Sequence, residues 1–262
     1  MTYPAADVNR EAYIDLIKRA ITNYLYLGGE TPQDAFRCAS HYDLKQGRWE
    51  IDPLSRPTTL LTKSQLDLIE KAVGAVEARG VAGHFLEAGV WRGGAIILMS
   101  ALIKAFNISG RKVFAADSFA GIPKNTRAIN DPVDQWSDRW VASVEEVKQA
   151  IGRFGLLDDR IEFVVGFFED SLKSLEGQQF SIVRLDSDSY DAVETSLEYL
   201  YPLLSQGGFL IVDDWHLPGC RMAVTEYRSQ LGVKDEIHEW DGNAYWVKQQ
   251  PYGYPAFPKA AK

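Results

Sequence analysis

The sequence has few cysteines and no long hydrophobic run. Its two cysteines, Cys38 and Cys220, are far apart and in no CxxC pattern, which argues against a disulfide framework or a zinc ribbon and fits a reducing cytoplasm. No stretch approaches the roughly 18 apolar residues that a membrane span needs. The opening MTYPAADVNREAY lacks the basic region and apolar core of a signal peptide. We therefore expect a cytoplasmic protein that does not span a membrane.

Positive charge is also scarce, because 28 basic residues face 36 acidic ones and leave a net charge of −8. A nucleic-acid-binding surface is basic, and so is a surface that binds anionic membranes. The sequence therefore predicts neither partner. Apolar residues make up 46% of the 262 residues, enough for the core of one large α/β domain.

Short apolar runs alternate with helical patterns over most of the chain. The runs are rich in β-branched or aromatic residues and lie at 84–90, 112–118, 161–167, 181–188, 209–214, 235–240 and 244–249. Helical spacing of apolar residues separates or flanks them at 94–107, 143–154, 190–204 and 220–231. This alternation predicts a mostly parallel seven-stranded sheet covered by helices, an α/β fold. Asp241-Gly242-Asn243 predicts a hairpin, and with it an antiparallel last strand.

Two further helical patterns precede the sheet. One covers residues 11–27 and should end at Gly28-Gly29, and the other covers 63–79. Residues 28–58 contain three prolines and read as an irregular connection or lid. We therefore expect an N-terminal helical extension and lid over 1–80, a core over 81–250 and a loosely docked tail over 251–262.

The first predicted strand of the sheet runs into a glycine-rich turn, GVWRGG, that leads to a helix. Its glycines, Gly89, Gly93 and Gly94, do not form the GxGxxG pattern of dinucleotide-binding proteins. Glu87 ends the strand, where a pyrophosphate would be repelled and a cationic ligand such as S-adenosylmethionine would be attracted. Asp117 ends the next strand and could accept hydrogen bonds from ribose hydroxyls. The alternative is that both acids cap helices.

Four carboxylates follow two strands that should be neighbours, and they are Asp186, Asp188, Asp213 and Asp214. Like charges at one sheet edge repel unless a cation lies among them. A set of oxygen ligands favours Mg²⁺ or Ca²⁺, so the sequence predicts a divalent cation between Asp186, Asp213 and Asp214. The alternatives are solvated loop residues or helix caps, and Asp188 and Ser189 could cap the helix near Tyr190.

A metal next to a methyl donor would bind substrate hydroxyls and lower the pKa of the one that attacks the methyl group. A nearby carboxylate or His216 could then accept the proton. A lone histidine is more often structural than catalytic, so both roles stay open for His216.

The segments LEAGVWRGG, VFAADSFAGIP, RLDSDSY and LIVDDW together resemble the TylF/MycF/NovP-type sugar O-methyltransferases, which tailor macrocin, mycinamicin and novobiocin. The resemblance runs from about Tyr13 to Lys248. It implies the class I, Rossmann-like methyltransferase fold, S-adenosylmethionine as cofactor and a required Mg²⁺. It also implies methylation of a deoxysugar hydroxyl on a glycosylated natural product, by a homo-oligomer.

The resemblance assigns roles to individual residues. Asp186, Asp213 and Asp214 are implied as metal ligands, with Asp186 favoured as proton acceptor over Asp188 and His216. The methionine part of the donor would contact Glu87, Ala88, Gly89, Val90, Trp91 and Gly94. The ribose would contact Asp117 and Ser118, and the adenine would lie near Phe168 and Glu169. Asp186 is also expected to contact the cofactor. Thr59-Leu60-Leu61 would close over the donor's amino-acid end.

Two regions depart from the family pattern, residues 31–58 and the shorter segment 124–141, which carries Trp136 and Trp140. In this family such regions form the acceptor pocket, so we expect an acceptor lid around 124–142 and leave the acceptor open. One alternative is the same chemistry on a catechol or other phenol. Another is a nicotinamide oxidoreductase or a non-catalytic nucleotide-binding protein, against which the missing GxGxxG and the clustered acids count.

Overall fold

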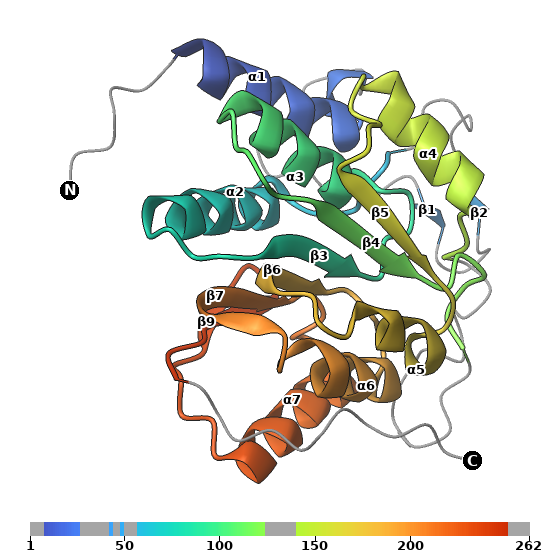
Figure 1. The fold of residues 1–262 in the computed structure, drawn as a ribbon. Coiled ribbons are helices and arrows are strands. Elements are labelled where there is room, and N and C mark those ends of the chain that lie inside the picture. Colours follow the sequence, from blue (N-terminus) through green and yellow to red (C-terminus); the bar gives the residue numbers. More distant parts are fainter. Residues whose placement is uncertain (1–7, 27–41, 44–47, 50–56, 124–139, 251–262) are drawn as a thin grey trace.

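The computed structural model describes residues 8–26, 42–43, 48–49, 57–123 and 140–250. Its centre is a seven-stranded sheet in the order β5-β4-β3-β6-β7-β9-β8 (Figure 1). The strands are β3 (His84–Ala88), β4 (Val113–Asp117), β5 (Ile161–Val165), β6 (Phe180–Leu185), β7 (Leu204–Val212), β8 (His238–Trp240) and β9 (Asn243–Val247). β3 to β7 pair in parallel, and β9 pairs antiparallel with both β7 and β8. The predicted mostly parallel seven-stranded sheet with an antiparallel last strand is confirmed.

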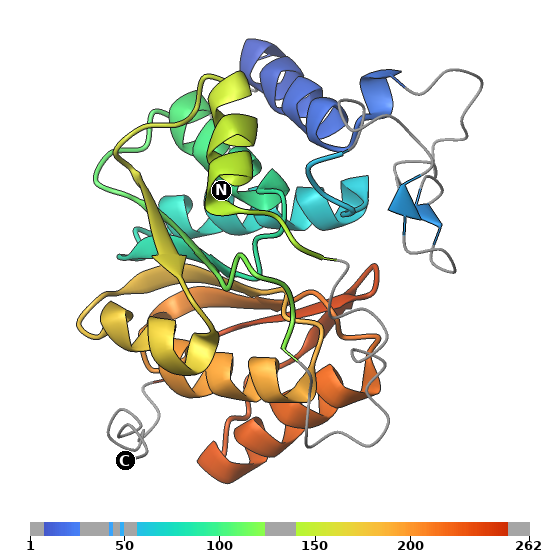
Figure 2. The same cartoon turned by 90° about the vertical axis from the view of Figure 1, so that its right-hand side faces the viewer.

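Helices cover both faces of the sheet (Figures 1 and 2). One face carries α1 (Val8–Ile21), α2 (Lys63–Ala78), α3 (Gly94–Ala105) and α4 (Val144–Arg153). The other carries α5 (Phe168–Ser171), the 3-10 turn Leu172–Leu175, α6 (Tyr190–Leu200) and α7 (Pro218–Leu231). α1 and α2 add Ile17 and Ile69 to the same buried core as Ile97 of α3. Both N-terminal helices therefore belong to one layer of the main domain.

Local sequence signals explain where several helices begin. Thr62 caps α2 and forms a reciprocal capping box with Gln65, and Ser143 does the same for α4 with Glu146. α3 buries ten of its twelve residues, Gly94 to Ile103, because it lies between the sheet and the outer helices. Its apolar sequence is therefore the signature of a buried helix.

The first helix ends earlier than predicted. It stops at Ile21, and a short 3-10 turn covers Tyr24–Tyr26. Asn23 takes a left-handed conformation with φ of 62°, which ends the helix before the Gly28-Gly29 pair is reached. A two-stranded hairpin that was not predicted pairs β1 (Tyr42–Asp43) with β2 (Arg48–Trp49).

The boundary between α6 and β7 also differs from the prediction. The helix predicted to run to residue 204 ends at Leu200, and the strand predicted to begin at 209 begins at Leu204. Pro202 accounts for the early end, because it has no backbone N–H to continue the helical hydrogen bonds beyond Tyr201, which is itself still helical in conformation. Leu204 pairs with Phe180, and a register shift follows before Phe209 pairs with Ile182, so Gly207-Gly208 lies inside the strand.

Several predicted features fall outside the described residues. They are Cys38, Trp136, the tail 251–262 and most of the connection 28–58 and of the acceptor lid 124–142. Cys220 is buried in α7. Within the described part of the chain, no helix has the length and apolar character needed to cross a membrane.

Candidate active site

A cavity of about 990 Å³ opens at the edge of the sheet where the parallel strands end. The residues after β3, β4, β6 and β7 line it, together with residues 58–62 and the turn between β8 and β9. Ligands of open α/β sheets bind at this edge. Every predicted site residue lines the cavity except Ala88, which is fully buried in β3.

The glycine-rich turn is shaped by a close backbone approach at Gly89. Its φ is +93°, and a Cβ atom there would lie 1.6 Å from the carbonyl oxygen of Asp186. The amide of Asp186 in turn donates to the carbonyl of Ala88 over 2.8 Å. A glycine is therefore required at 89, because the end of β3 lies directly against the end of β6.

Asp117 holds the next part of this turn in place. Its Oδ2 accepts from the amides of Val90 and Trp91, over 2.7 and 3.1 Å, and its Oδ1 accepts from the amide of Phe119 over 2.7 Å. Trp91 has φ of 44°, an unusual value for a bulky residue. The structure thus gives Asp117 a role in fixing backbone, while its predicted contact with a ribose stays a prediction.

Residues Thr58–Thr62, here called the strap, close the cavity on the side of α2. The amide of Gly94 donates to the carbonyl of Thr58 over 3.0 Å, and a Cβ atom at Gly94 would lie 2.4 Å from Cβ of Thr59. Gly94 is therefore a contact point between the strap and the start of α3. Thr59, Leu60 and Leu61 line the cavity, as the predicted closure over the donor requires.

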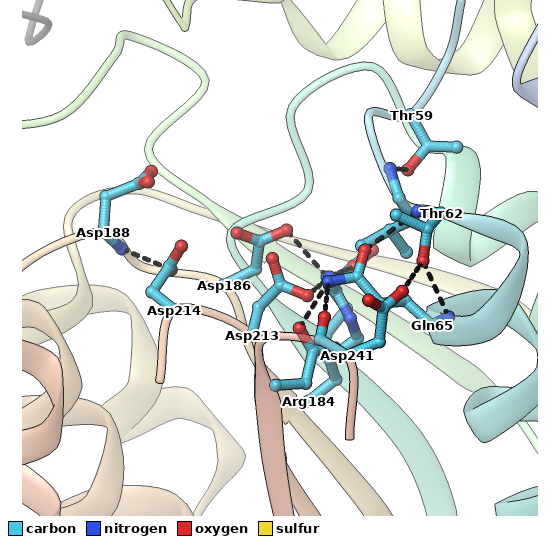
Figure 3. Close-up of polar contacts among 12 residues, drawn as sticks. Thr59, Thr62, Gln65, Arg184, Asp186, Asp188, Asp213, Asp214 and Asp241 are labelled. Atoms are coloured by element: carbon cyan, nitrogen blue, oxygen red, sulfur yellow. Dashed lines mark hydrogen bonds and ion pairs between the residues drawn. The ribbon is translucent and has the colours of Figure 1, made fainter. Parts of the chain in front are cut away.

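The turn between β8 and β9 anchors the other end of the strap (Figure 3). Thr62 Oγ1 donates to a carboxylate oxygen of Asp241. Gln65 Nε2 donates to the carbonyl of Asp241 over 2.9 Å and to Oδ1 of Asn243 over 2.8 Å. The hairpin turn and the first turn of α2 therefore form one hydrogen-bonded unit beside the cavity.

Glu87 and Arg184 form a buried ion pair across β3 and β6. The side chain of Arg184 is 1% exposed and that of Glu87 is 2% exposed. One oxygen of Glu87 accepts from Arg184, while its other oxygen, Oε2, is buried and has no hydrogen-bond partner among the described residues. Burial raises the pKa of Glu87 to about 8, although the charge of Arg184 opposes that shift.

Arg184 also binds the two acids that follow β6 and β7. Its Nη1 donates to Asp186 over 2.8 Å, and its Nη2 donates to Asp213 (Figure 3). The sequence predicted a divalent cation alone as the group that offsets the repulsion among these carboxylates, but the protein also supplies the guanidinium of Arg184. The sequence reasoning missed it, although an arginine between Val183 and Leu185 of a fully buried strand was a visible signal.

The acids that come closest together are Asp186, Asp188 and Asp214, each with an oxygen within 4.8 Å of the others. The amide of Asp188 donates to Asp214 over 3.0 Å. Burial raises the pKa of Asp186 to about 6, with the charge of Asp213 adding to it, and raises the pKa of Asp214 well above its usual range. Repulsion between the neighbouring acids contributes to both pKa shifts, and a cation among them would relieve it.

The structure therefore brings the four predicted acids into one cluster but divides them differently from the predicted metal triad. Asp213 contacts Arg184, while Asp188 joins Asp186 and Asp214. The backbone of Asp188 is left-handed, with φ of 57°. The adjacent Ser189 caps α6 by accepting from the amide of Ala192 over 3.2 Å, so one of the two predicted caps is confirmed.

The remaining predicted residues lie around the same cavity. His216 is exposed at its rim, next to Asp214. Phe168 and Glu169 begin α5, a short helix that was not predicted. Trp140 packs edge-on against Trp91, with ring centroids 5.6 Å apart, so the described end of the predicted acceptor lid contacts the glycine-rich turn.

The known proteins that this chain resembles are O-methyltransferases. The family model for macrocin O-methyltransferase (TylF) matches residues 10–249. An 8-demethyl-8-(2,3-dimethoxy-α-L-rhamnosyl)-tetracenomycin-C 4′-O-methyltransferase from Streptomyces olivaceus is 36% identical, over 90% of this chain and 92% of its own length. Mycinamicin III 3″-O-methyltransferase from Micromonospora griseorubida is 35% identical, over 90% and 96%.

A solved structure supports the fold. The O-methyltransferase NovP superimposes with a TM-score of 0.79 and 31% identity, over 92% of this chain and all of that one. The class I methyltransferase fold that the resemblance implied is confirmed.

Proposed function

This chain is an O-methyltransferase of the macrocin O-methyltransferase (TylF) family, and from that premise we propose that it methylates a sugar hydroxyl of a glycosylated small molecule. The methyl donor is S-adenosylmethionine, and a Mg²⁺ ion assists. The observation that carries this proposal is a single cavity that joins the partnerless Oε2 of Glu87 to the cluster of four aspartates.

The residues at the Glu87 end suit the donor. A buried carboxylate oxygen with no partner is costly, and a cationic ligand group would satisfy it. The ammonium of S-adenosylmethionine is such a group. The adjoining surface consists of the glycine-rich turn and the strap, whose hydroxyl and backbone groups suit an amino-acid carboxylate. Asp117, Ser118, Phe168 and Glu169, farther along the same cavity, are proposed to contact the ribose and adenine.

The residues at the aspartate end suit a hard divalent cation, because they offer only oxygen atoms. Asp186 and Asp214 belong both to the triad implied by the family and to the cluster of closest acids. We assign them as two ligands, and Asp213, whose second oxygen is not used by Arg184, as the third. When bound, Mg²⁺ would orient the acceptor hydroxyl and lower its pKa.

Asp188 is then the nearest carboxylate left to accept the proton. Asp186 was the favoured acceptor from the family resemblance, but one of its oxygens accepts from Arg184 over 2.8 Å. Asp188 lies within the same cluster, and its left-handed backbone is of the kind often found in active sites. We therefore assign Asp188 as the general base, with His216 at the rim as the competing candidate.

The acceptor is inferred from the relatives. The two relatives are named for methylating a rhamnosyl tetracenomycin and mycinamicin III. The side of the cavity beyond the aspartates, formed by Asp191, Thr195 and His216, offers polar groups that suit sugar hydroxyls. A homo-oligomer working in the cytoplasm remains part of this proposal, and light scattering of the purified protein tests its assembly.

The test is a methylation assay with S-adenosylmethionine, MgCl₂ and a panel of deoxysugar glycosides and catechols. We expect methylation of a glycoside and its loss in excess EDTA. Activity confined to caffeate-like catechols would favour the phenolic alternative. Undiminished activity in EDTA would contradict the metal, and tight NADH binding without S-adenosylmethionine binding would contradict the donor.

A further inference from the structure

We propose that Arg184 is a positioning residue that fixes the donor-binding carboxylate and the metal-binding carboxylates relative to one another. This inference rests on the proposed function. It concerns a side chain that the sequence reasoning did not select and that does not itself line the cavity.

The first argument is where the partners of Arg184 come from. Glu87 is the penultimate residue of β3, Asp186 follows β6 and Asp213 follows β7, and these three strands are neighbours. Arg184 pairs in register with Glu87 on one side and with Ile211 on the other. Its side chain therefore starts from the middle strand and can contact acids at the ends of all three.

The second argument is how each acid is used. Arg184 donates hydrogen bonds to one oxygen of each of the three carboxylates, Oε1 of Glu87, Oδ2 of Asp186 and Oδ1 of Asp213. All three acids line the cavity, whereas Arg184 lies behind them. The second oxygen of each carboxylate takes no part in these bonds with Arg184. A group that holds one oxygen of a carboxylate fixes the direction of the other.

The third argument is the chemistry of the guanidinium. Its planar, rigid donors can bind several carboxylates at set angles, whereas the ammonium of lysine is a single point of charge. A guanidinium stays protonated in proteins, and that of Arg184 has three carboxylates as partners. The cation is thus permanent, and it lets three acids converge where repulsion would otherwise separate them.

The consequence concerns the distance between the two ends of the site. Methyl transfer needs the donor's methyl group and the acceptor oxygen in line, and a misplacement of about 1 Å can cost about a hundredfold in rate. Glu87 is proposed to hold the donor, and Asp186 and Asp213 the metal that holds the acceptor. One rigid group that binds all three sets that spacing before any ligand arrives.

The experiment is calorimetric titration of S-adenosylmethionine into the protein, followed by MgCl₂ into the donor complex. The variants are Arg184→Lys, which keeps the charge, Glu87→Gln and the double variant. Glu236→Gln is a matched control, because Glu236 is exposed and does not line the cavity. Melting temperatures are recorded for all of them.

We expect Arg184→Lys to lower the affinities for the donor and for Mg²⁺ by about tenfold or more, as loss of an orienting partner does at metal sites. Glu87→Gln should lower chiefly the affinity for the donor. The double variant should bind the donor within about twofold of Glu87→Gln alone, because Arg184 acts on the donor through Glu87. Glu236→Gln should leave both the donor affinity and the Mg²⁺ affinity unchanged.

Two results would overturn the proposal. The first is Arg184→Lys with a lowered melting temperature but donor and Mg²⁺ affinities within about twofold of wild type, which would make Arg184 purely structural. The second is wild-type protein that binds neither ligand, in which case the proposed function fails first and this inference fails with it. Wild-type protein that binds both ligands, together with lower affinities of Arg184→Lys for both, would support the proposed function and this inference.

Arg184→Lys could fail to fold, so a second variant is included. Glu87→Gln/Arg184→Met removes one negative and one positive charge together, which buried sites tolerate better than loss of one partner. Asp186 and Asp213 then lose their shared donor while the local charge changes little. Mg²⁺ affinity should fall about tenfold below that of wild type, and an affinity equal to that of wild type would contradict a positioning role.

Discussion

The two ends of the cavity are built by different means. The donor end, at the glycine-rich turn and the strap, is held by backbone hydrogen bonds and by glycines that permit close approach. The proposed metal end is held by charge, because a buried arginine binds Glu87, Asp186 and Asp213, and Asp188 and Asp214 lie beside Asp186. Backbone shape should therefore control donor affinity, and the balance of charge should control metal affinity and turnover.

The largest effect should come from Asp214→Asn. Asparagine keeps the size of the side chain and can still accept from the amide of Asp188, but it removes a charged metal ligand. We expect Mg²⁺ binding to be lost and turnover to fall about a thousandfold, since metal assistance contributes several kcal/mol. Donor affinity should stay within a few-fold. Loss of donor binding instead would mean that the two ends are not separate.

A smaller loss of turnover should follow Asp188→Asn, the change at the proposed base. A general base contributes about a hundredfold to ten-thousandfold, so we expect about a hundredfold, with Mg²⁺ affinity nearly unchanged. His216→Ala is the matched comparison and should cost less than tenfold. A larger loss for His216→Ala, or lost Mg²⁺ binding in Asp188→Asn, would reassign the base or the third ligand.

The pH dependence of stability tests the charged end without ligands. The pKa of Glu87 is raised from 4.5 to about 8, so the folded protein holds this proton more tightly than the unfolded chain does. The ligand-free protein should then lose stability as pH rises from about 4.5 to about 8, because Glu87 must ionise while buried. Chemical denaturation should show that Glu87→Gln loses less free energy of unfolding than wild type over that pH range. Parallel plots of this free energy against pH for the two proteins would contradict the raised pKa of Glu87.

The smallest effect is expected at the anchor of the strap. Asp241 has φ of 48° and accepts from Thr62. In Asp241→Gly, glycine can adopt the same backbone conformation, but the acceptor for Thr62 is lost. The affinity for the donor should fall about three- to tenfold, since one hydrogen bond contributes about 1 kcal/mol. Asp241→Asn keeps an acceptor and should bind normally. Equal weakening in both variants would point to charge rather than to the anchor.

The sequence predicted the fold and the glycine-rich turn after β3 well, because their signals are local. The alternation of strands and helices, Gly89 after Glu87, and the Asp-Gly turn before β9 each act within a few residues. The end of α6 was missed although Pro202 marks it, because apolar residues continue through Leu204 at helical spacing.

The metal end was predicted in composition but not in arrangement. Which acids contact Arg184 and which contact one another depends on the order of β3, β6 and β7 and on their register. Residue spacing along the chain does not contain that information. The anchor between Thr62 and Asp241 joins positions 179 residues apart, and it was missed for the same reason.

The most direct measurement is calorimetry on wild type and Asp214→Asn, with S-adenosylmethionine titrated first and MgCl₂ second. A donor end and a metal end in one cavity predict that wild type binds both ligands and that Asp214→Asn binds only S-adenosylmethionine. Wild-type protein that binds S-adenosylmethionine but shows no heat with MgCl₂ would contradict the metal end, and leave the aspartates as counter-ions of Arg184.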